Sequence, residues 1–280
     1  LMDFEYMRIP RTGLNLQYYG NSNNLQVIWL PVFEHDRLAK PSSEFSFFNQ
    51  FGVGGLSARL DESDRPNRVG LGEIGVKWSA LYSGWNPSLF YYYAQEHTPA
   101  YLPVMTETSL TFQSKYGRVH QVGFTVSKDL NGVILRSEGV ISAGRTFARI
   151  DDRIGGFEEK TVYEMAIGAS YNFPGNINAN LQFYRRDVID KDEKIIDIAP
   201  RSTVSLWLNP KIFSSRLNPV FFYMYDIQVK DWMFRASISY NVSDAWTITV
   251  GGDLFGGNEK GFWGQFNHSD RVYSLLRYAF

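Results

Sequence analysis

Four histidines, His35, His97, His120 and His268, are the residues of this chain best suited to acid–base chemistry or metal binding. A hydrolase or acyltransferase needs a serine nucleophile, a histidine base and a third group that orients the base. None of the four lies in a Gly-x-Ser-x-Gly frame, and their scattered positions lack the spacing of metal ligands. The chain has no cysteine, which excludes a thiolate nucleophile, a thiolate metal site and a disulfide. The sequence therefore predicts a protein that is not an enzyme and has no catalytic, cofactor or metal site.

Two acidic segments, Asp151-Asp152 and the run from Asp187 to Asp197, leave two interpretations open. Clustered carboxylates can bind calcium weakly at a surface. They are also the ordinary composition of a solvated loop, which is the interpretation we favour.

Charged residues of both signs alternate with apolar ones along the predicted strands. Inside a β-barrel they would form a constriction that biases which ions or solutes pass, or ion pairs that brace the wall. Arg136 and Glu138 share a face and could pair, and Glu164 could join them. Because both signs are present, no strong preference for either charge is expected. The candidates for the lumen or constriction are Glu73, Lys77, Arg136, Glu138, Glu164, Arg186, Arg235, Asp253 and Arg277.

Period-two alternation of apolar and polar residues is the main pattern, and it is clearest toward the C-terminus. It predicts fourteen strands: residues 3–9, 13–20, 24–33, 73–82, 88–96, 118–127, 132–144, 161–171, 177–186, 201–212, 218–227, 232–242, 245–255 and 271–280. Short turns near 21–23, 83–87, 128–131, 172–176, 213–217 and 243–244 alternate with longer connections near 34–72, 97–117, 145–160, 187–200 and 256–270, and with a short one at 228–231. The segments 34–72 (with Phe45 to Phe51) and 97–117 could each hold a further hairpin. Twelve to sixteen strands are therefore compatible with the pattern.

Three features favour a membrane barrel over a soluble sandwich. The predicted strands are about ten residues long, which is the length that a tilted strand needs to cross a bilayer. Aromatic residues make up 16% of the chain and cluster at strand ends, as they do at membrane interfaces. The chain ends with Leu276, Tyr278 and Phe280 at alternate positions, a pattern similar to the C-terminal signal recognised by the bacterial barrel-assembly machinery.

These features predict an all-β, transmembrane, antiparallel up-and-down β-barrel of about fourteen strands, formed as a single domain over residues 1–280. In hydrocarbon no backbone N–H or C=O can stay unpaired, so the first and last strands should pair with each other. With 28 basic and 29 acidic residues, the chain lacks the positive charge that nucleic-acid binding requires. No run of about 20 apolar residues predicts a transmembrane helix.

The stretch from Val133 to Phe280 resembles a family of uncharacterised proteobacterial outer-membrane β-barrels. The residues that carry the resemblance are Val133 to Gly139, the Leu181-Gln182-Phe183 strand, Gly256-Gly257, Phe262 to Phe266, Asp270 to Tyr273, and Tyr278-Ala279-Phe280. The resemblance implies an outer-membrane location, porin-like architecture and additional N-terminal strands beyond those of this chain.

Two functions follow from this fold. The first is a porin-like outer-membrane channel for passive or substrate-selective diffusion of a small solute, with outer-membrane lipid and the barrel-assembly machinery as its partners. The alternative is a closed barrel that acts as a surface-binding or structural protein through its long outer loops. The last connection bears on the choice, because it carries Phe262, Trp263 and Phe266 among glycines. We favour an exposed loop with its aromatics packed on the rim over an inward-folded constriction.

Overall fold

The computed structural model describes residues 9–36, 39, 43–46, 57–66, 69–106, 108–150, 155–197, 199, 201–213 and 216–279. In this part of the chain the regular structure is almost entirely β, with one short 3-10 helix, η3 (Gly264–Phe266). None of the described helical segments is long and apolar enough to span a membrane. The all-β, antiparallel prediction is confirmed.

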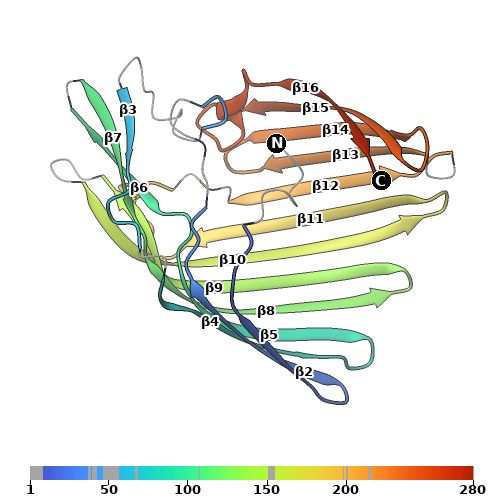
Figure 1. The fold of residues 1–280 in the computed structure, drawn as a ribbon, viewed down its shortest axis with the longest axis horizontal. Helices are drawn as coiled ribbons and strands as arrows, with labels where there is room; N and C mark the ends of the chain where they lie inside the picture. The colour runs from blue at the N-terminus through green and yellow to red at the C-terminus, as the bar shows by residue number, and fades with distance from the viewer. Residues whose placement is uncertain are drawn as a thin grey trace.

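Thirteen strands form one large antiparallel sheet in the order β1-β2-β4-β5-β8-β9-β10-β11-β12-β13-β14-β15-β16. Figure 1 shows this sheet as a strongly curved wall. The strands are β1 (Leu14–Tyr19), β2 (Asn23–Val32), β4 (Val69–Ala80), β5 (Trp85–Gln95), β8 (Arg118–Leu130), β9 (Val133–Arg149), β10 (Gly156–Phe173), β11 (Ile177–Val188), β12 (Ser202–Pro210), β13 (Leu217–Asp226), β14 (Asp231–Asn241), β15 (Trp246–Gly257) and β16 (Arg271–Tyr278).

These strands correspond one by one to the predicted strands from 13–20 to 271–280. Residues 3–8 of the predicted first strand lie outside the described residues. Strands β1 and β16 are the two edges of the sheet, and no pairing joins them in the described part of the chain. The strand number and the closure therefore remain predictions.

Short and long connections lie at opposite ends of the wall. The turns between β1 and β2, β4 and β5, and β8 and β9 are at one end, and the long connections between β2 and β4 and between β5 and β8 are at the other (Figure 1). We refer to these as the turn end and the loop end. This segregation is typical of outer-membrane barrels.

A second, three-stranded sheet lies at the loop end, formed by β3 (Ser57–Asp61), β6 (Ala100–Met105) and β7 (Ser109–Lys115) (Figure 1). Strands β6 and β7 are the hairpin that the 97–117 segment could hold. Strand β3 comes from the 34–72 segment and pairs in parallel with β7. The hairpin expected at Phe45 to Phe51 cannot be compared, because residues 47–51 lie outside the described residues. Leu110 and Phe112 are buried in this sheet against Ala58, Leu60 and Tyr101.

The connection predicted at 145–160 is wrong in extent, because β9 and β10 continue to Arg149 and from Gly156. Their extended ends are stabilised by a buried cluster of Phe147, Val162 and Ile195, the last contributed by the β11–β12 connection. The register shifts between Lys160 and Val162, which interrupts the strict alternation there. Contacts with a distant loop therefore extend a hairpin that local pattern alone does not reveal.

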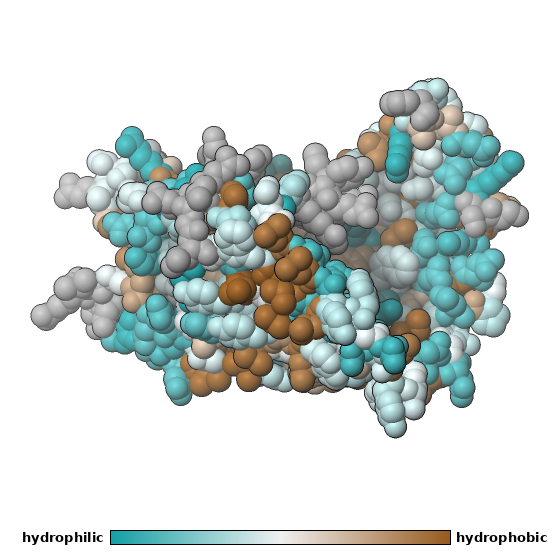
Figure 2. Space-filling view, turned by 60° about the horizontal axis from the view of Figure 1, so that its bottom comes forward, coloured by the Kyte–Doolittle hydropathy of each residue, from teal (hydrophilic) through white to brown (hydrophobic). Residues whose placement is uncertain are grey.

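The two faces of the large sheet differ in polarity. Ile238, Tyr240, Ile248 and Val250 have exposed fractions of 48%, 44%, 42% and 51%, whereas Asp253 on the opposite face is fully buried. We call the first side the apolar face and the second the polar face. Figure 2 shows hydrophobic side chains gathered near the middle of the surface it presents, with hydrophilic ones toward its ends. This arrangement is the reverse of a soluble sandwich, whose apolar face is buried.

Candidate functional site on the polar face

All nine candidate lumen residues project from the polar face. Directly opposite residues in an antiparallel pair share a face, and this relation can be followed from strand to strand. One row runs through Lys77, Phe90, Gly123, Val140, Glu164 and Arg186. Arg235 and Asp253 form another such pair on β14 and β15.

The polar face is the concave face of the sheet. Phe45 belongs to the β2–β4 connection, which begins near one edge of the sheet. Its ring nevertheless lies 6.2 Å from Phe255 and 5.7 Å from Phe266, which pack on the polar face of β14 and β15 near the other edge. A curved sheet allows this crossing only on its concave side.

Asp253 lies between two arginines. Arg235 Nε donates to Asp253 Oδ1 at 2.5 Å, and Arg271 Nε donates to Oδ2 at 2.6 Å. The Arg271 guanidinium also lies 5.6 Å from the ring centres of both Phe45 and Tyr273. This cluster combines two cations, one anion and the Tyr273 ring on β14, β15 and β16 with the Phe45 ring from the β2–β4 connection. Our set of candidates omits Arg271, although its alternation with Val272 indicates the polar face.

Glu73 is the centre of a second cluster, near the loop end of β4. Only 2% of its side chain is exposed, and its Oε2 accepts a hydrogen bond from Arg11 Nη1 at 3.2 Å and another from the Tyr92 hydroxyl. His97 Nε2 lies 2.9 Å from Glu73 Oε1, and His97 Nδ1 lies 2.7 Å from the Glu34 carbonyl oxygen. Arg11, Tyr92 and His97 are not among the nine lumen candidates, because no local pattern connects residues so far apart in the chain to Glu73.

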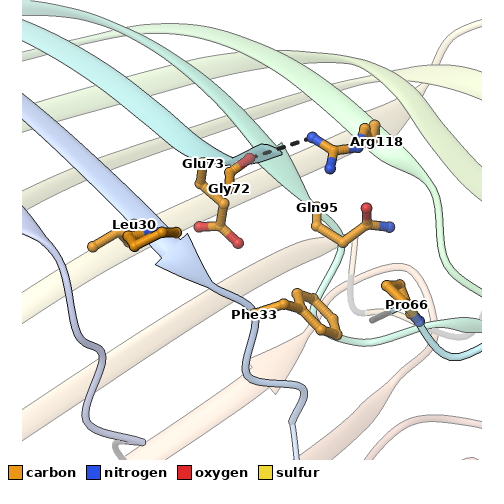
Figure 3. Close-up of a pocket in the computed structure, with 8 residues that line it drawn as sticks. Leu30, Phe33, Pro66, Gly72, Glu73, Gln95 and Arg118 are labelled. Atoms are coloured by element: carbon orange, nitrogen blue, oxygen red, sulfur yellow. Dashed lines mark hydrogen bonds between the residues drawn. The ribbon is translucent and has the colours of Figure 1, made fainter. Parts of the chain in front are cut away.

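A small pocket adjoins this cluster, lined by residues that include Leu30, Phe33, Glu73 and Arg118 (Figure 3). Arg118 donates to the Gly72 carbonyl oxygen at 3.3 Å. The Phe33 ring stacks on His97 with a centroid distance of 5.4 Å. The β2–β4 and β5–β8 connections are thus fixed to each other and to the sheet.

A third cluster joins β11 to the connection that follows it. Asp197 accepts hydrogen bonds from Arg186 Nη1 at 2.8 and 2.9 Å and from Lys191 Nζ at 2.9 Å. Burial raises the pKa of Asp197, but Arg186 and Lys191 outweigh this effect and hold the pKa below its usual value. Nearby, the Tyr184 hydroxyl donates to Glu164 at 2.6 Å.

The suggested association of Arg136, Glu138 and Glu164 is not observed. Arg136 Nη1 instead donates to Ser170 Oγ at 3.1 Å. Glu138 is exposed and lies opposite Thr125 and Ala166. Lys77 and Arg277 are also exposed, and the ion pairs found among the described residues include neither of them. Some candidates are therefore tied into the wall, while others remain accessible.

The loop between β15 and β16 folds inward, contrary to the exposed loop that we favoured. Phe266 is only 8% exposed and packs against Met233 and Phe255 on the polar face, together with Trp263. Asp231 fixes the loop, because its Oδ2 accepts the backbone N–H groups of Trp263 at 2.6 Å and Gly264 at 3.2 Å. The loop folds inward because Phe266 and Trp263 pack on an apolar patch of the polar face that is formed by residues distant in sequence.

The described acidic residues show no calcium-binding arrangement. Asp187 pairs with Arg185, Asp192 with Arg149, and Asp197 with Arg186 and Lys191. No group of three or more potential ligands that could hold a metal ion occurs among the residues that the structure describes. Asp151 and Asp152 lie outside them. His120 lies on the apolar face, 2.9 Å from the Tyr91 hydroxyl, and its ring packs on Tyr93.

Comparison with known proteins gives similarity of structure without similarity of sequence. No family model matches the chain, and no curated protein matches it. A structure described as "Copper transporter OprC" is similar with a TM-score of 0.52 and 9% identity, covering 95% of this chain and 47% of its own. The structure of Pseudomonas aeruginosa OccK11 (OpdR) has a TM-score of 0.47 and 11% sequence identity, and the match covers 98% of this chain and 73% of the OccK11 chain. The structure described as "KdgM porin in complex with disordered oligogalacturonate" has a TM-score of 0.31 and 10% sequence identity, and the match covers 75% of this chain and 92% of the KdgM chain.

At these identities the similarity concerns the fold alone. The OprC comparison aligns this chain with about half of a larger transporter. It supports the β-architecture of the large sheet.

Proposed function

We propose that this chain is an outer-membrane channel for passive or substrate-selective diffusion of small solutes, with the polar face as its wall. The observation that carries the proposal is the polarity of the sheet, whose exposed apolar side chains lie on one face and whose charged side chains lie on the concave face. Lipid against the apolar face and water against the polar face would account for both the exposed apolar side chains and the charged ones. A soluble domain would leave this apolar face unexplained.

The same polarity requires a closed barrel. Each unpaired backbone group in hydrocarbon costs several kcal/mol, so open edges at β1 and β16 are incompatible with a membrane-spanning state. We propose that these edges are paired in the membrane and that residues 1–280 act as a single barrel domain. A barrel of twelve to sixteen strands is wide enough to enclose a lumen.

Two connections narrow this lumen at the loop end. Phe45 and Phe266 pack on the polar face beside the Arg235–Asp253–Arg271 cluster. A constriction formed by charged and aromatic groups selects by size and by charge distribution. Of the nine candidates, Lys77, Arg136, Glu138 and Arg277 are exposed, and we propose that a passing solute meets these residues and Arg271. Glu73, Arg186 and Asp253 are buried in the wall and hold it together.

The inward loops also support the alternative of a closed barrel that acts through its outer surface. The β3-β7-β6 sheet extends from the loop end and offers such a surface (Figure 1). The two functions differ in whether the barrel conducts ions.

Conductance in planar lipid bilayers tests the proposal. The purified chain is expected to give discrete, stable conductance steps, because a paired, closed barrel holds a fixed pore. Asp231→Ala removes the acceptor that fixes the β15–β16 loop and is expected to raise the conductance of each step. Asp244→Ala, in an exposed turn, serves as the control.

A protein that inserts but stays silent, in both the wild type and Asp231→Ala, would contradict the channel and support the closed barrel. Location is tested by membrane fractionation, with recovery in the outer-membrane fraction expected. Outer-membrane lipid and the barrel-assembly machinery are then its partners. Leu276 and Tyr278 of the proposed assembly signal lie on the apolar face, and Phe280 lies outside the described residues.

A further inference from the structure

A cluster of polar side chains interrupts the apolar face at the loop end of β5 and β8. It consists of Tyr91, Tyr93, Arg118 and His120. We infer that this cluster binds the phosphate group of a lipid in the outer leaflet of the membrane. The inference rests on the proposed function, because a membrane-spanning barrel with its long connections outside brings the loop end of this face to the outer headgroups.

The polarity of the apolar face changes along the strands toward the loop end. One row of directly opposite residues contains Val122 and Ile141, which are 59% and 50% exposed. The next row pairs Tyr93 with His120, and Arg118 lies one row further. A lipid has the same order of groups, with apolar chains next to a charged headgroup.

His120 offers an N–H group at the surface. Its Nδ1 lies 2.9 Å from the Tyr91 hydroxyl oxygen, and its ring packs on Tyr93 with a centroid distance of 4.6 Å. When the hydroxyl donates to Nδ1, the neutral imidazole carries its proton on Nε2. The side chain is exposed, and among the described residues no hydrogen bond occupies Nε2. This N–H group is therefore available to an anion.

Arg118 supplies a permanent positive charge beside His120. Its guanidinium lies 5.3 Å from the centre of the Tyr93 ring, and its Nη1 donates to the Gly72 carbonyl oxygen at 3.3 Å. Both partners are uncharged, and the ion pairs found in the described part of the chain do not include Arg118. A guanidinium has five N–H donors in a planar arrangement that matches phosphate. Arg118 can thus bind a phosphate while it keeps its contact with Gly72.

A second arginine on the apolar face lacks this free charge. Arg185 on β11 alternates with Phe183, which is 40% exposed. Its Nε and Nη2 donate to the two carboxylate oxygens of Asp187 at 2.6 and 2.5 Å. That pair has no net charge to attract a headgroup, whereas the cluster around Arg118 does. Positive charge at the membrane surface favours anionic lipids.

The apolar neighbours of the cluster favour a lipid over free phosphate as the occupant. Val122 and Ile141 lie directly beside the polar row and are open to the surroundings. An acyl chain attached to the bound phosphate would cover them, and a free phosphate ion would leave them exposed. The inference therefore commits to a phosphate that carries acyl chains.

Lipid binding to the purified protein in detergent micelles, measured by native mass spectrometry, tests this inference. Phosphatidic acid has a bare phosphate headgroup, and phosphatidylcholine with the same acyl chains carries a cation on its phosphate. Phosphatidic acid is expected to bind with about tenfold lower Kd than phosphatidylcholine, because its phosphate alone has an uncompensated charge for Arg118. Equal Kd values for the two lipids would overturn the inference.

Two variants test the residues of the cluster. Arg118→Gln keeps an N–H group for the Gly72 carbonyl and removes the charge, so it is expected to raise the Kd of phosphatidic acid about tenfold. His120→Leu places an apolar residue at an exposed position and is expected to raise this Kd about threefold, which tests the site even if Arg118→Gln fails to fold. Lys128→Gln, which removes a cation over the Trp85 ring at the turn end of the same face, is the matched control and should leave the Kd unchanged.

Phosphatidic acid that binds equally well to Arg118→Gln and Lys128→Gln, or whose Kd is unaffected by His120→Leu, would overturn the inference. Displacement of the lipid by inorganic phosphate at the same concentration would assign the site to the free ion and would overturn it as well. These measurements do not depend on conductance. A protein that binds the lipid but stays silent in planar bilayers would contradict the channel and leave the lipid site standing, and a conducting protein without the lipid preference would do the reverse.

Discussion

Asp253 shows how a single residue organises the polar face. Its carboxylate is fully buried and is the common partner of Arg235 and Arg271, whose side chains are 15% and 30% exposed. Without it, two like charges would lie on β14 and β16, on either side of β15, with no anion between them. The carboxylate therefore holds two arginines, and through Arg271 the Phe45 ring, at the proposed constriction.

Replacing Asp253 by alanine is expected to lower the free energy of unfolding by about 3 kcal/mol, because it leaves partly buried arginines unpaired. Urea titration of the protein in detergent micelles measures this change. Asp244→Ala, in an exposed turn, should change the free energy by less than about 0.5 kcal/mol. Equal stability of the two variants would show that the cluster does not support the fold.

At this scale the sequence predicts which face a charged residue occupies, but not its partner. Parity along each strand is enough to place Glu73, Arg186 and Asp253 on the polar face. Asp253 finds its partners on the neighbouring strands, whereas Arg11, His97 and Asp197, which pair with Glu73 and Arg186, lie outside the strands. Nothing in the local pattern fixes where a connection returns to the sheet.

Among the elements, the β11–β12 connection is attached to the wall by one buried carboxylate. Asp197 is 3% exposed and bridges Arg186 at the end of β11 and Lys191 within the connection. Backbone hydrogen bonds from Ile150 to Lys194 and from Ile196 to Ala148 add contacts with β9 and the residue that follows it. The ion pairs and this backbone pairing together hold the loop against the extended β9–β10 hairpin.

The attachment should depend on pH. Because the pKa of Asp197 in the folded state lies below its usual value of 3.8, its contribution to stability is present above that value and is lost as pH falls through the lowered pKa. The difference in unfolding free energy between the wild type and Asp197→Asn should therefore be constant near neutral pH and shrink at acidic pH. Asp190→Asn, an exposed change in the same loop, should show no such dependence, and a difference that grows on acidification would contradict the assignment.

Strands were predictable and loops were not, for a physical reason. A strand between lipid and water has apolar and polar residues at alternate positions, and this alternation is visible in the sequence. The predicted strands 232–242 and 245–255 therefore match β14 and β15 closely. Strand β3 and the inward β15–β16 loop depend on contacts between segments distant in sequence. Such contacts produce no periodic pattern in the sequence.

For the molecule as a whole, the central claim is that one sheet separates lipid from water. The exposed apolar face and the polar face opposite it agree with that claim, and so does the segregation of short turns from long connections (Figure 1). All three were accessible from alternation and connection length. Closure of the barrel was inferred from the physics of hydrogen bonding in hydrocarbon, and it stays a prediction because β1 and β16 are not paired with each other in the described residues.

Cysteine scanning along β15 tests this claim most directly, because the natural chain has no cysteine to give a background. Ile248 and Val250 lie on the apolar face. Thr249 between them lies on the polar face, where its Oγ1 is 2.8 Å from Ser239 Oγ. With the protein in lipid vesicles, Thr249→Cys should react with a charged, water-soluble thiol reagent, while Ile248→Cys and Val250→Cys should not. Reaction at 248 and 250 with protection at 249 would contradict the account.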